Sequence, residues 1–309
     1  MDGRRLDEQT LDGQKSGGRT LDRRAFLGTV TAATVLGRQF AWAADTHKIE
    51  KVGVQLYTVR SEMKQDFEGK LAKVAEIGYR EVEFAGYEDH TAQEVRAMLD
   101  RHGLTGPSAH VPYKSLGEPW PGVLDAAHVV GHKYIVNPYI DDDVRKGPDG
   151  WKRAAETFNR AGEASQKAGI QFAYHNHWFE FAPVNGKLPY DILLEECDPK
   201  LVKMEMDLCW IKVGGQDPLK YFKKYPGRFP LVHVKDLTKI PKVDASGGQN
   251  FGDSLPEMTE VGSGIIDWKL ILGQSDKAGI KHYFVEHDHP KAPFESIKTS
   301  YQYLAKLQF

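Results

Sequence analysis

The segment from Trp151 to His177 contains the unit that decides the fold: a helical pattern, a glycine and an apolar run that ends in a polar pair. Residues 151–168 have helical periodicity, and Gly169 can end that helix in a left-handed conformation. Residues 170–177 then read Ile-Gln-Phe-Ala-Tyr-His-Asn-His, a short run typical of a buried strand. Because successive side chains of a strand point to opposite faces, we expect His175 and His177 to share a face.

The same order of helix, glycine and strand recurs along the chain. Glycines also follow helical patterns at Gly78, Gly103 and Gly279. Eight strands are predicted over residues 52–57, 81–85, 105–110, 134–137, 170–176, 202–208, 231–235 and 283–287, with intervening helices that include 67–77, 92–102, 151–168 and 267–278. Strands that alternate with helices form a parallel sheet, so eight such units predict a single (β/α)8 TIM barrel of the α/β class.

Three further predicted strands end in an i, i+2 polar pair. These pairs are Glu205 with Asp207, His233 with Lys235, and Glu286 with Asp288. The carboxyl ends of barrel strands meet around one mouth, so we expect these side chains and the histidine pair to converge on one pocket. Ionisable groups at this density are costly to bury unless they bind or react with a ligand.

Imidazoles and carboxylates together form a ligand set for one divalent metal. The expected metal ligands come from four consecutive strands: His175, Asp207, His233 and Glu286. Nitrogen and oxygen ligands suit Mn, Co, Zn or Fe. Mg is less suitable in a site with two imidazoles, because it prefers oxygen ligands. The group contains no cysteine, which excludes a structural zinc or soft-metal site. The sequence leaves open whether Cys197 and Cys209 form a disulfide, although two thiols do not define a disulfide framework in a domain of this size.

At these motifs the chain resembles the xylose isomerase-like TIM-barrel superfamily of sugar isomerases and epimerases, with its inosose dehydratase and dehydroshikimate dehydratase relatives. The most specific segments are residues 78–83, 174–177, 207–210, 233–236 and 285–286. The resemblance implies one divalent metal held by Glu, Asp, His and Glu on strands five to eight, of which the last three correspond to Asp207, His233 and Glu286. Where many members have Glu followed two residues later by His, this chain has His175 and His177, as dehydratase relatives do.

This replacement bears on the expected reaction. In the family's epimerases the missing Glu is also one of two bases, so direct epimerisation by two glutamates is not expected. Glu205 lies on the face of Asp207, one layer deeper, and three roles stay open for it: a metal ligand in place of His175, a buried general base, or the partner of a neighbouring Lys or Arg. We expect Glu205 or His177, acting with Glu286, to move the proton.

Lys235 stands where the family places a lysine that touches the substrate. A cation beside a metal is expected to have a lowered pKa, which suits an acid or an oxyanion stabiliser. The resemblance also implies substrate contacts at Glu83 and His110. The alternative for Glu83 is to contact a metal ligand and orient it. Further side chains expected to line the pocket are Glu180, Trp210 and Asp288, with Trp210 stacked on a sugar.

These residues predict a metal-dependent sugar isomerase or epimerase that acts on a keto-sugar or sugar derivative. The expected mechanism is proton abstraction through a metal-bound ene-diolate. A keto-sugar dehydratase or lyase on the same site is the main alternative. A metal-dependent phosphodiester hydrolase and a non-catalytic sugar-binding protein are further alternatives.

The charge balance bears on the partners. The chain has 41 basic and 43 acidic residues, so no global positive field draws it to nucleic acid or to an anionic membrane. A small carbohydrate is the expected partner, nucleic acid is not, and a homo-oligomer stays open.

The stretch from Leu237 to Gly264 interrupts the alternation, being rich in Gly, Ser, Asp and Pro. Because it follows a strand, we expect it to lie over the mouth as a lid or substrate loop. Within it, Gly262-Ser263-Gly264 could present backbone N–H groups to an anion or serve as a hinge.

Residues 1–43 are expected to be a twin-arginine signal peptide, and residues 44–309 the barrel. Arg23 and Arg24 precede a weakly apolar run that ends at Leu36, and Ala41-Trp42-Ala43 offers a small-x-small cleavage site. An ordinary N-terminal helix with two arginines is the alternative. The run is too short and too mildly apolar for a permanent membrane anchor, so a periplasmic or secreted location is expected.

Export should depend on the arginine pair. Changing Arg23 and Arg24 to Lys is expected to leave precursor in the cytoplasm, because a lysine does not reproduce the planar guanidinium donor fork. Immunoblots of cytoplasmic and periplasmic fractions measure this. Normal periplasmic delivery of the double-lysine protein would contradict the signal-peptide interpretation.

Overall fold

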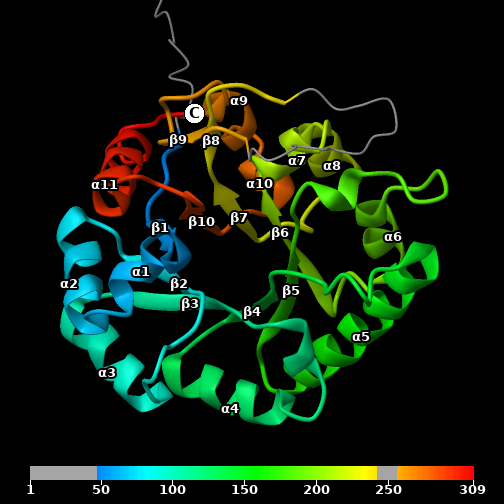
Figure 1. The fold of residues 1–309 in the computed structure, drawn as a ribbon, viewed down its shortest axis with the longest axis horizontal. Helices are drawn as coiled ribbons and strands as arrows, with labels where there is room; N and C mark the ends of the chain where they lie inside the picture. The colour runs from blue at the N-terminus through cyan, green and yellow to red at the C-terminus, as the bar shows by residue number, and fades with distance from the viewer. Residues whose placement is uncertain (1–46, 242–255) are drawn as a thin grey trace, which may run out of the picture. The chain divides into compact units, whose positions relative to one another are not determined.

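The computed structural model describes residues 47–241 and 256–309. Within them eight parallel strands close into a barrel in the order β1-β10-β7-β6-β5-β4-β3-β2, surrounded by helices (Figure 1). The barrel strands are β1 Val52–Gln55, β2 Glu81–Phe84, β3 Thr105–His110, β4 Tyr134–Asn137, β5 Gln171–His175, β6 Val202–Asp207, β7 Leu231–Val234 and β10 His282–Val285. The predicted (β/α)8 barrel is confirmed. The predicted signal peptide lies outside the described residues.

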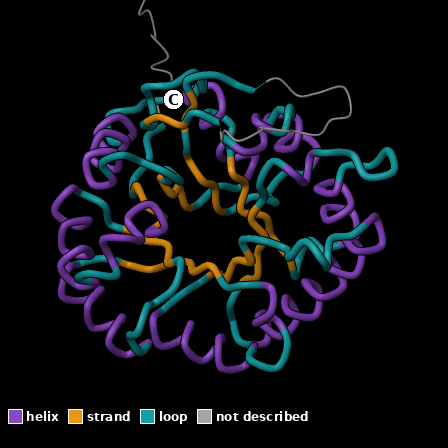
Figure 2. The backbone as a smooth tube through the Cα atoms, in the orientation of Figure 1, coloured by secondary structure: helices purple, strands orange, loops and turns teal. Residues whose placement is uncertain are grey.

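Helices form the outer ring, as Figure 2 shows by colour. The α-helices are α1 Arg60–Met63, α2 Phe67–Ile77, α3 Ala92–His102, α4 Trp120–Val130, α5 Gly147–Lys167, α6 Pro189–Glu196, α7 Trp210–Val213, α8 Pro218–Lys224, α9 Trp268–Leu272, α10 Ser275–Ala278 and α11 Pro293–Leu304. Three short 3-10 helices cover Leu56–Val59, Tyr113–Leu116 and Phe179–Phe181. Within the described residues no helix is long and apolar enough to cross a membrane.

Two expected elements differ in detail. The helix predicted over residues 267–278 is divided into α9 and α10, because Gly273 follows α9 as its C-cap and has low helix propensity. The first strand ends at Gln55 rather than at Tyr57, because the Gln55 side chain accepts a hydrogen bond from Tyr57 N and caps a 3-10 turn there. At the expected glycine cap Gly78, φ is +124° and an added Cβ would lie 2.4 Å from the Tyr301 ring, so only glycine fits.

The barrel has two apolar regions. The larger lies between the strands and the helices and includes Trp151, Phe222 and Trp268. The smaller lies inside the barrel and consists of Tyr134, Val136, Ala173, Leu231 and Phe284. The inward-facing residues of the next layer toward the carboxyl ends of the strands are polar or charged. The candidate site therefore lies at the carboxyl end of the barrel, above the apolar layer.

A small antiparallel sheet lies within the stretch that was expected to be an irregular loop. Strand β8 Asp236–Leu237 pairs with β9 Met258–Thr259. The buried Asp236 carboxylate fixes this region, because it accepts hydrogen bonds from the backbone N–H groups of Gly262 and Ile266 and from the Trp268 indole. Strands of two residues are too short to show an alternating pattern.

Of the two roles left open for Gly262-Ser263-Gly264, a hinge or the presentation of N–H groups to an anion, the second is not available to the first two residues. Gly262 N donates to Asp236 Oδ2 at 3.0 Å, and Ser263 N donates to the Glu260 carbonyl at 2.9 Å. Cys197 and Cys209 are buried free thiols, so the disulfide that the sequence left open does not form.

Candidate active site

Strand register brings the expected polar residues together at the carboxyl end of the barrel. His175 lies opposite Glu205 on the neighbouring strand, and Asp207 lies opposite His233. Each of these side chains is at most 2% exposed. The convergence expected from the i, i+2 spacing is therefore present.

Glu205 is surrounded by three histidines in the deeper part of the site. Its Oε2 atom lies 2.8 Å from His110 Nε2, 3.1 Å from His175 Nδ1 and 3.2 Å from His233 Nε2. The contact with His175 Nδ1 turns Nε2 of that ring toward Asp207 Oδ2, 3.8 Å away. Glu205 therefore fixes the orientation of His175.

Glu83 holds His233 in a similar way from the opposite side of the barrel. Its Oε2 atom lies 2.7 Å from His233 Nε2 and accepts a hydrogen bond from Gln55 Nε2 at 2.8 Å. Burial opposes ionisation of Glu83, but His110 and His233 together lower its pKa well below the ordinary value. Conversely, burial opposes the charged form of His110, but Glu83 and Glu205 raise its pKa to about 9.

The upper part of the site joins Asp207, His233, Lys235 and Glu286. His233 Nδ1 and Lys235 Nζ each lie 2.7 Å from Glu286 Oε2. Lys235 Nζ also lies 3.1 Å from Asp207 Oδ2 and 2.8 Å from Asp288 Oδ1. Burial raises the pKa of Asp207 to about 6, against the opposing effect of Lys235 and His233.

The expected lowering of the Lys235 pKa is not seen in the protein alone. Burial disfavours the ammonium form, but Asp207, Asp288 and Glu286 together raise its pKa well above the ordinary value. Three carboxylates outweigh desolvation because all of them lie within 3.1 Å of the same nitrogen.

Two overlapping groups of side chains place donor atoms close enough for one cation. The deeper group is His110, His175, Glu205 and His233, and the upper group is Asp207, His233 and Glu286. In each group the donor atoms lie within 4.8 Å of one another. Ligands about 2.1 Å from a tetrahedral ion are about 3.4 Å apart, so both groups are of suitable size.

Several buried polar atoms of the site have no hydrogen-bond partner among the described residues: His177 Nδ1, Glu205 Oε1 and Trp210 Nε1. Leaving such atoms unpaired is costly in a protein interior. Asp207 is held rigidly, since its Oδ1 atom accepts from the backbone N–H groups of Cys209 and Trp210 and its Oδ2 atom is ion-paired with Lys235 Nζ at 3.1 Å. A carboxylate fixed in this way suits a cation ligand.

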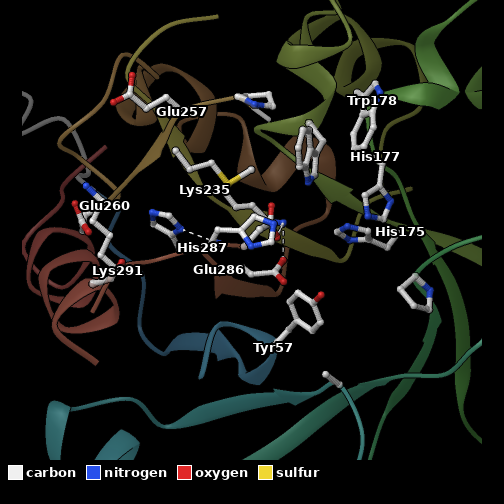
Figure 3. A pocket seen from close by; sticks show the side chains of 18 of the residues that line it. Tyr57, His175, His177, Trp178, Lys235, Glu257, Glu260, Glu286, His287 and Lys291 are labelled. Carbon is white, nitrogen blue, oxygen red and sulfur yellow. Dashed lines mark hydrogen bonds and ion pairs between the residues drawn. The ribbon is translucent and has the colours of Figure 1, made fainter. Parts of the chain in front are cut away.

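A cavity of about 960 Å³ opens above these residues (Figure 3). The expected site residues on its wall are His110, His175, His177, Trp210, Lys235, Glu286 and Asp288. Trp178 and Trp210 form an aromatic part of the wall, with ring centroids 4.7 Å apart. Trp210 therefore lies on the cavity wall, and its stacking on a sugar stays a prediction.

Other expected site residues lie behind the wall: Glu83, Glu180, Glu205, Asp207 and His233 are each fully buried. The structure therefore does not place Glu83 and Glu180 where a substrate contact was expected. Glu180 accepts hydrogen bonds from the Tyr174 hydroxyl and from His177 N, and burial raises its pKa to about 7. It lies behind the wall because the chain turns after β5 into a 3-10 helix at Phe179–Phe181.

Several residues of the site were not singled out from the sequence. Gln55 and Ser108 both donate to Glu83, and Ser108 shares its strand face with His110, so strand alternation could have identified it. Glu260 and Lys291 also line the cavity, the first directly after β9 and the second in the segment that precedes α11. No periodic pattern connects those segments to the barrel mouth.

Comparison with known proteins identifies the family. The sequence pattern described as "Xylose isomerase-like TIM barrel" matches residues 71–307. The chain belongs to this family. The match covers the barrel from α2 to the residues that follow α11, and it confirms the resemblance inferred from the motifs.

Relatives with recorded activities are enzymes. An inosose dehydratase from Lacticaseibacillus casei is 25% identical over 266 residues, which cover 77% of this chain and 88% of that protein. The crystal structure of a sugar phosphate isomerase/epimerase from Parabacteroides distasonis is 28% identical and has a TM-score of 0.69, covering 84% of this chain and 95% of that one. The structure of the IOLI protein with bound zinc has a TM-score of 0.64 at 15% identity, covering 82% and 98%, and shares the fold.

Proposed function

We propose that this protein is a metal-dependent enzyme that removes a proton from the carbon next to the carbonyl of a polyhydroxy ketone and then eliminates a β-hydroxyl group as water. The observation that carries the proposal is the pairing of two unlike groups on one cavity wall. His177 offers a ring nitrogen without a partner among the described residues, and Lys235 offers a charged ammonium group. The relatives that are inosose dehydratases support this reaction class.

The residues fit a divalent cation held by His175, Asp207, His233 and Glu286. Asp207 Oδ2 is buried and held 3.1 Å from Lys235 Nζ, and His175 Nε2 faces it at 3.8 Å. Asp207, His233 and Glu286 already lie within 4.8 Å of one another. When bound there, a divalent cation would polarise the ketone oxygen and acidify the adjacent C–H bond. This upper group is preferred to the deeper one because its carboxylate Glu286 lines the cavity, whereas the carboxylate of the deeper group, Glu205, lies behind the cavity wall.

Glu205 and Glu83 then act on the site through histidines. Each carboxylate contacts the nitrogen of a metal-binding imidazole that points away from the upper group, His175 Nδ1 and His233 Nε2 respectively. Carboxylates in this position fix the tautomer and orientation of the ring and strengthen it as a ligand. Because Glu205 does not line the cavity, we assign it this positioning role rather than that of the base.

In the proposed reaction His177 accepts the proton from the carbon next to the ketone. Burial lowers the pKa of His177 to about 3, so its ring is neutral in the protein without substrate. The C–O bond to the neighbouring hydroxyl then breaks, Lys235 donates a proton to the departing oxygen, and water and an unsaturated ketone leave. Both groups return to their starting protonation states by exchange with solvent. Base and acid of different kinds suit elimination, whereas epimerisation needs two groups that can exchange roles.

A sugar isomerase or epimerase is the second candidate. The similarity to the Parabacteroides distasonis isomerase/epimerase favours it, since 95% of that chain is covered at 28% identity. Glu286, which lies on the cavity wall, is the group that would return the proton at another position.

Metal binding should depend on the upper group. We expect Glu286→Gln and His233→Ala to weaken binding of Zn or Mn by more than roughly 100-fold, because each removes a direct ligand. His110→Ala should keep about one metal per chain, and His128→Ala, an exposed histidine on α4, is the matched control. Metal analysis after dialysis and circular dichroism measure occupancy and folding. A metal that is lost from His110→Ala but kept by Glu286→Gln would assign the deeper group instead.

Substitution of the base and substitution of the positioning residue should have different kinetic effects. With metal at saturation, His177→Ala is expected to slow exchange of the substrate C–H proton in D2O by about 10²–10⁴-fold, the usual contribution of a general base. Glu205→Gln should weaken metal affinity by about 10–100-fold, with exchange recovering when metal is added. Proton NMR with an inosose and with fructose measures the exchange, and ultraviolet absorbance detects the unsaturated ketone. If saturating metal does not restore Glu205→Gln while His177→Ala exchanges normally, Glu205 is the base.

A further inference from the structure

The cavity extends well beyond the metal and acid–base residues. Figure 3 shows His175, His177 and Trp178 on one side and Glu257, Glu260 and Lys291 on the other, with Lys235 and Glu286 between them. We call the second side the outer end and define it by these lining residues: Glu257, Glu260, His289, Lys291, Glu295, Ser296 and Thr299. It is formed by the residues on either side of β9, by the residues after β10 and by the first turns of α11.

The size of the cavity exceeds what one sugar ring requires. Pockets that enclose drug-sized ligands measure roughly 300–1,000 Å³, and this cavity measures about 960 Å³. A single six-carbon ketone placed against Lys235 and Glu286 would leave the outer end of the cavity filled only by solvent. The geometry therefore has room for a second group attached to the reacting ketone.

The charge of the outer end restricts the nature of that group. Three carboxylates, those of Glu257, Glu260 and Glu295, line it, and Lys291 supplies one opposing ammonium group. Like charges that face one another across a binding site disfavour a ligand of the same sign. A phosphate would be repelled here, whereas hydroxyl groups could donate hydrogen bonds to the carboxylates.

Buried polar atoms on the wall point to a hydroxyl-rich ligand. Ser296 is 3% exposed, and its Oγ atom faces Glu260 without a hydrogen bond of normal geometry to any described residue. Trp210 Nε1, on the wall beside the reacting centre, is also buried and unpaired within the described chain. A sugar hydroxyl can serve as partner to either atom, and indole rings such as Trp210 offer a flat apolar face to a sugar ring.

We propose that the outer end is a second sugar subsite, so that the substrate is an unphosphorylated ketone that carries a glycosyl group rather than a sugar phosphate. This inference rests on the proposed function for the position of the ketone. The reacting ring lies against Lys235 and Glu286, and the attached sugar extends toward Glu260 and Ser296. The chain would in this way differ in substrate class from a sugar phosphate isomerase.

Three ketoses that differ only at the 6-position test the subsite: fructose, fructose 6-phosphate and isomaltulose, which is 6-O-glucosyl-fructose. Isothermal titration of the metal-loaded protein should show isomaltulose binding about tenfold more tightly than fructose, the gain expected from one or two added hydrogen bonds. Fructose 6-phosphate should bind no more tightly than fructose. Equal affinities for fructose and isomaltulose, or tightest binding of fructose 6-phosphate, would overturn the subsite.

Charge reversal at the outer end provides the second measurement. The double variant Glu257→Lys with Glu295→Lys should bind fructose 6-phosphate several-fold more tightly and isomaltulose more weakly, with fructose unchanged. Both positions are exposed, so folding should not suffer. Glu156→Lys with Glu163→Lys, on the exposed face of α5, is the control for net charge. If the control pair changes the affinities as much as the outer-end pair, the subsite assignment fails.

The two proposals can fail separately. Proton exchange into fructose without any preference for isomaltulose would refute the second subsite and leave the proposed reaction standing. The expected order of affinities without exchange into any of the three sugars would support the subsite and refute the proposed reaction.

Discussion

The structure depends on the burial of ionisable side chains inside the barrel, where each must be paired. Glu83 and Glu205 are fully buried near the barrel axis, and an isolated carboxylate there would be strongly destabilising. His110 and His233 lie within 3.2 Å of both carboxylates, and this contact offsets the cost of burial. A barrel built for stability alone would place branched apolar residues in this layer. The apolar layer below it, which includes Leu231 and Phe284, is of that kind.

The same pairing prepares the mouth of the barrel for chemistry. The contacts of His175 and His233 with the two deep carboxylates fix the rings, and their other nitrogens face Asp207 and Glu286. Lys235 lies among three carboxylates that keep it charged. The upper side chains thus have fixed positions before any ligand arrives, which is the condition for an effective catalytic site. Residues outside the barrel strands, in β9 and α11, then determine the depth and charge of the cavity above them.

The fold and the inner part of the site could be predicted from local pattern. Strand alternation placed His175, Asp207, His233 and Glu286 on one side, and the closed barrel brought them together. The pattern could not tell a residue on the cavity wall from one behind it. Glu180 was misplaced because a 3-10 turn follows β5, and Glu83 and Glu205 lie too deep to reach the cavity. The outer end could be predicted only in part: residues 237–264 were expected to lie over the mouth, and Glu257 and Glu260 of that stretch line the cavity. Lys291 and Ser296 meet them only through tertiary packing.

The central claim is that one divalent cation binds the upper group, above a layer of paired histidines and carboxylates. Anomalous diffraction from crystals of the zinc- or manganese-loaded protein tests it most directly. The account predicts one peak within bonding distance, about 2.0–2.2 Å, of Asp207, His233, Glu286 and His175. A peak bound instead by His110 and Glu205, or no peak in a metal-saturated crystal, would contradict it.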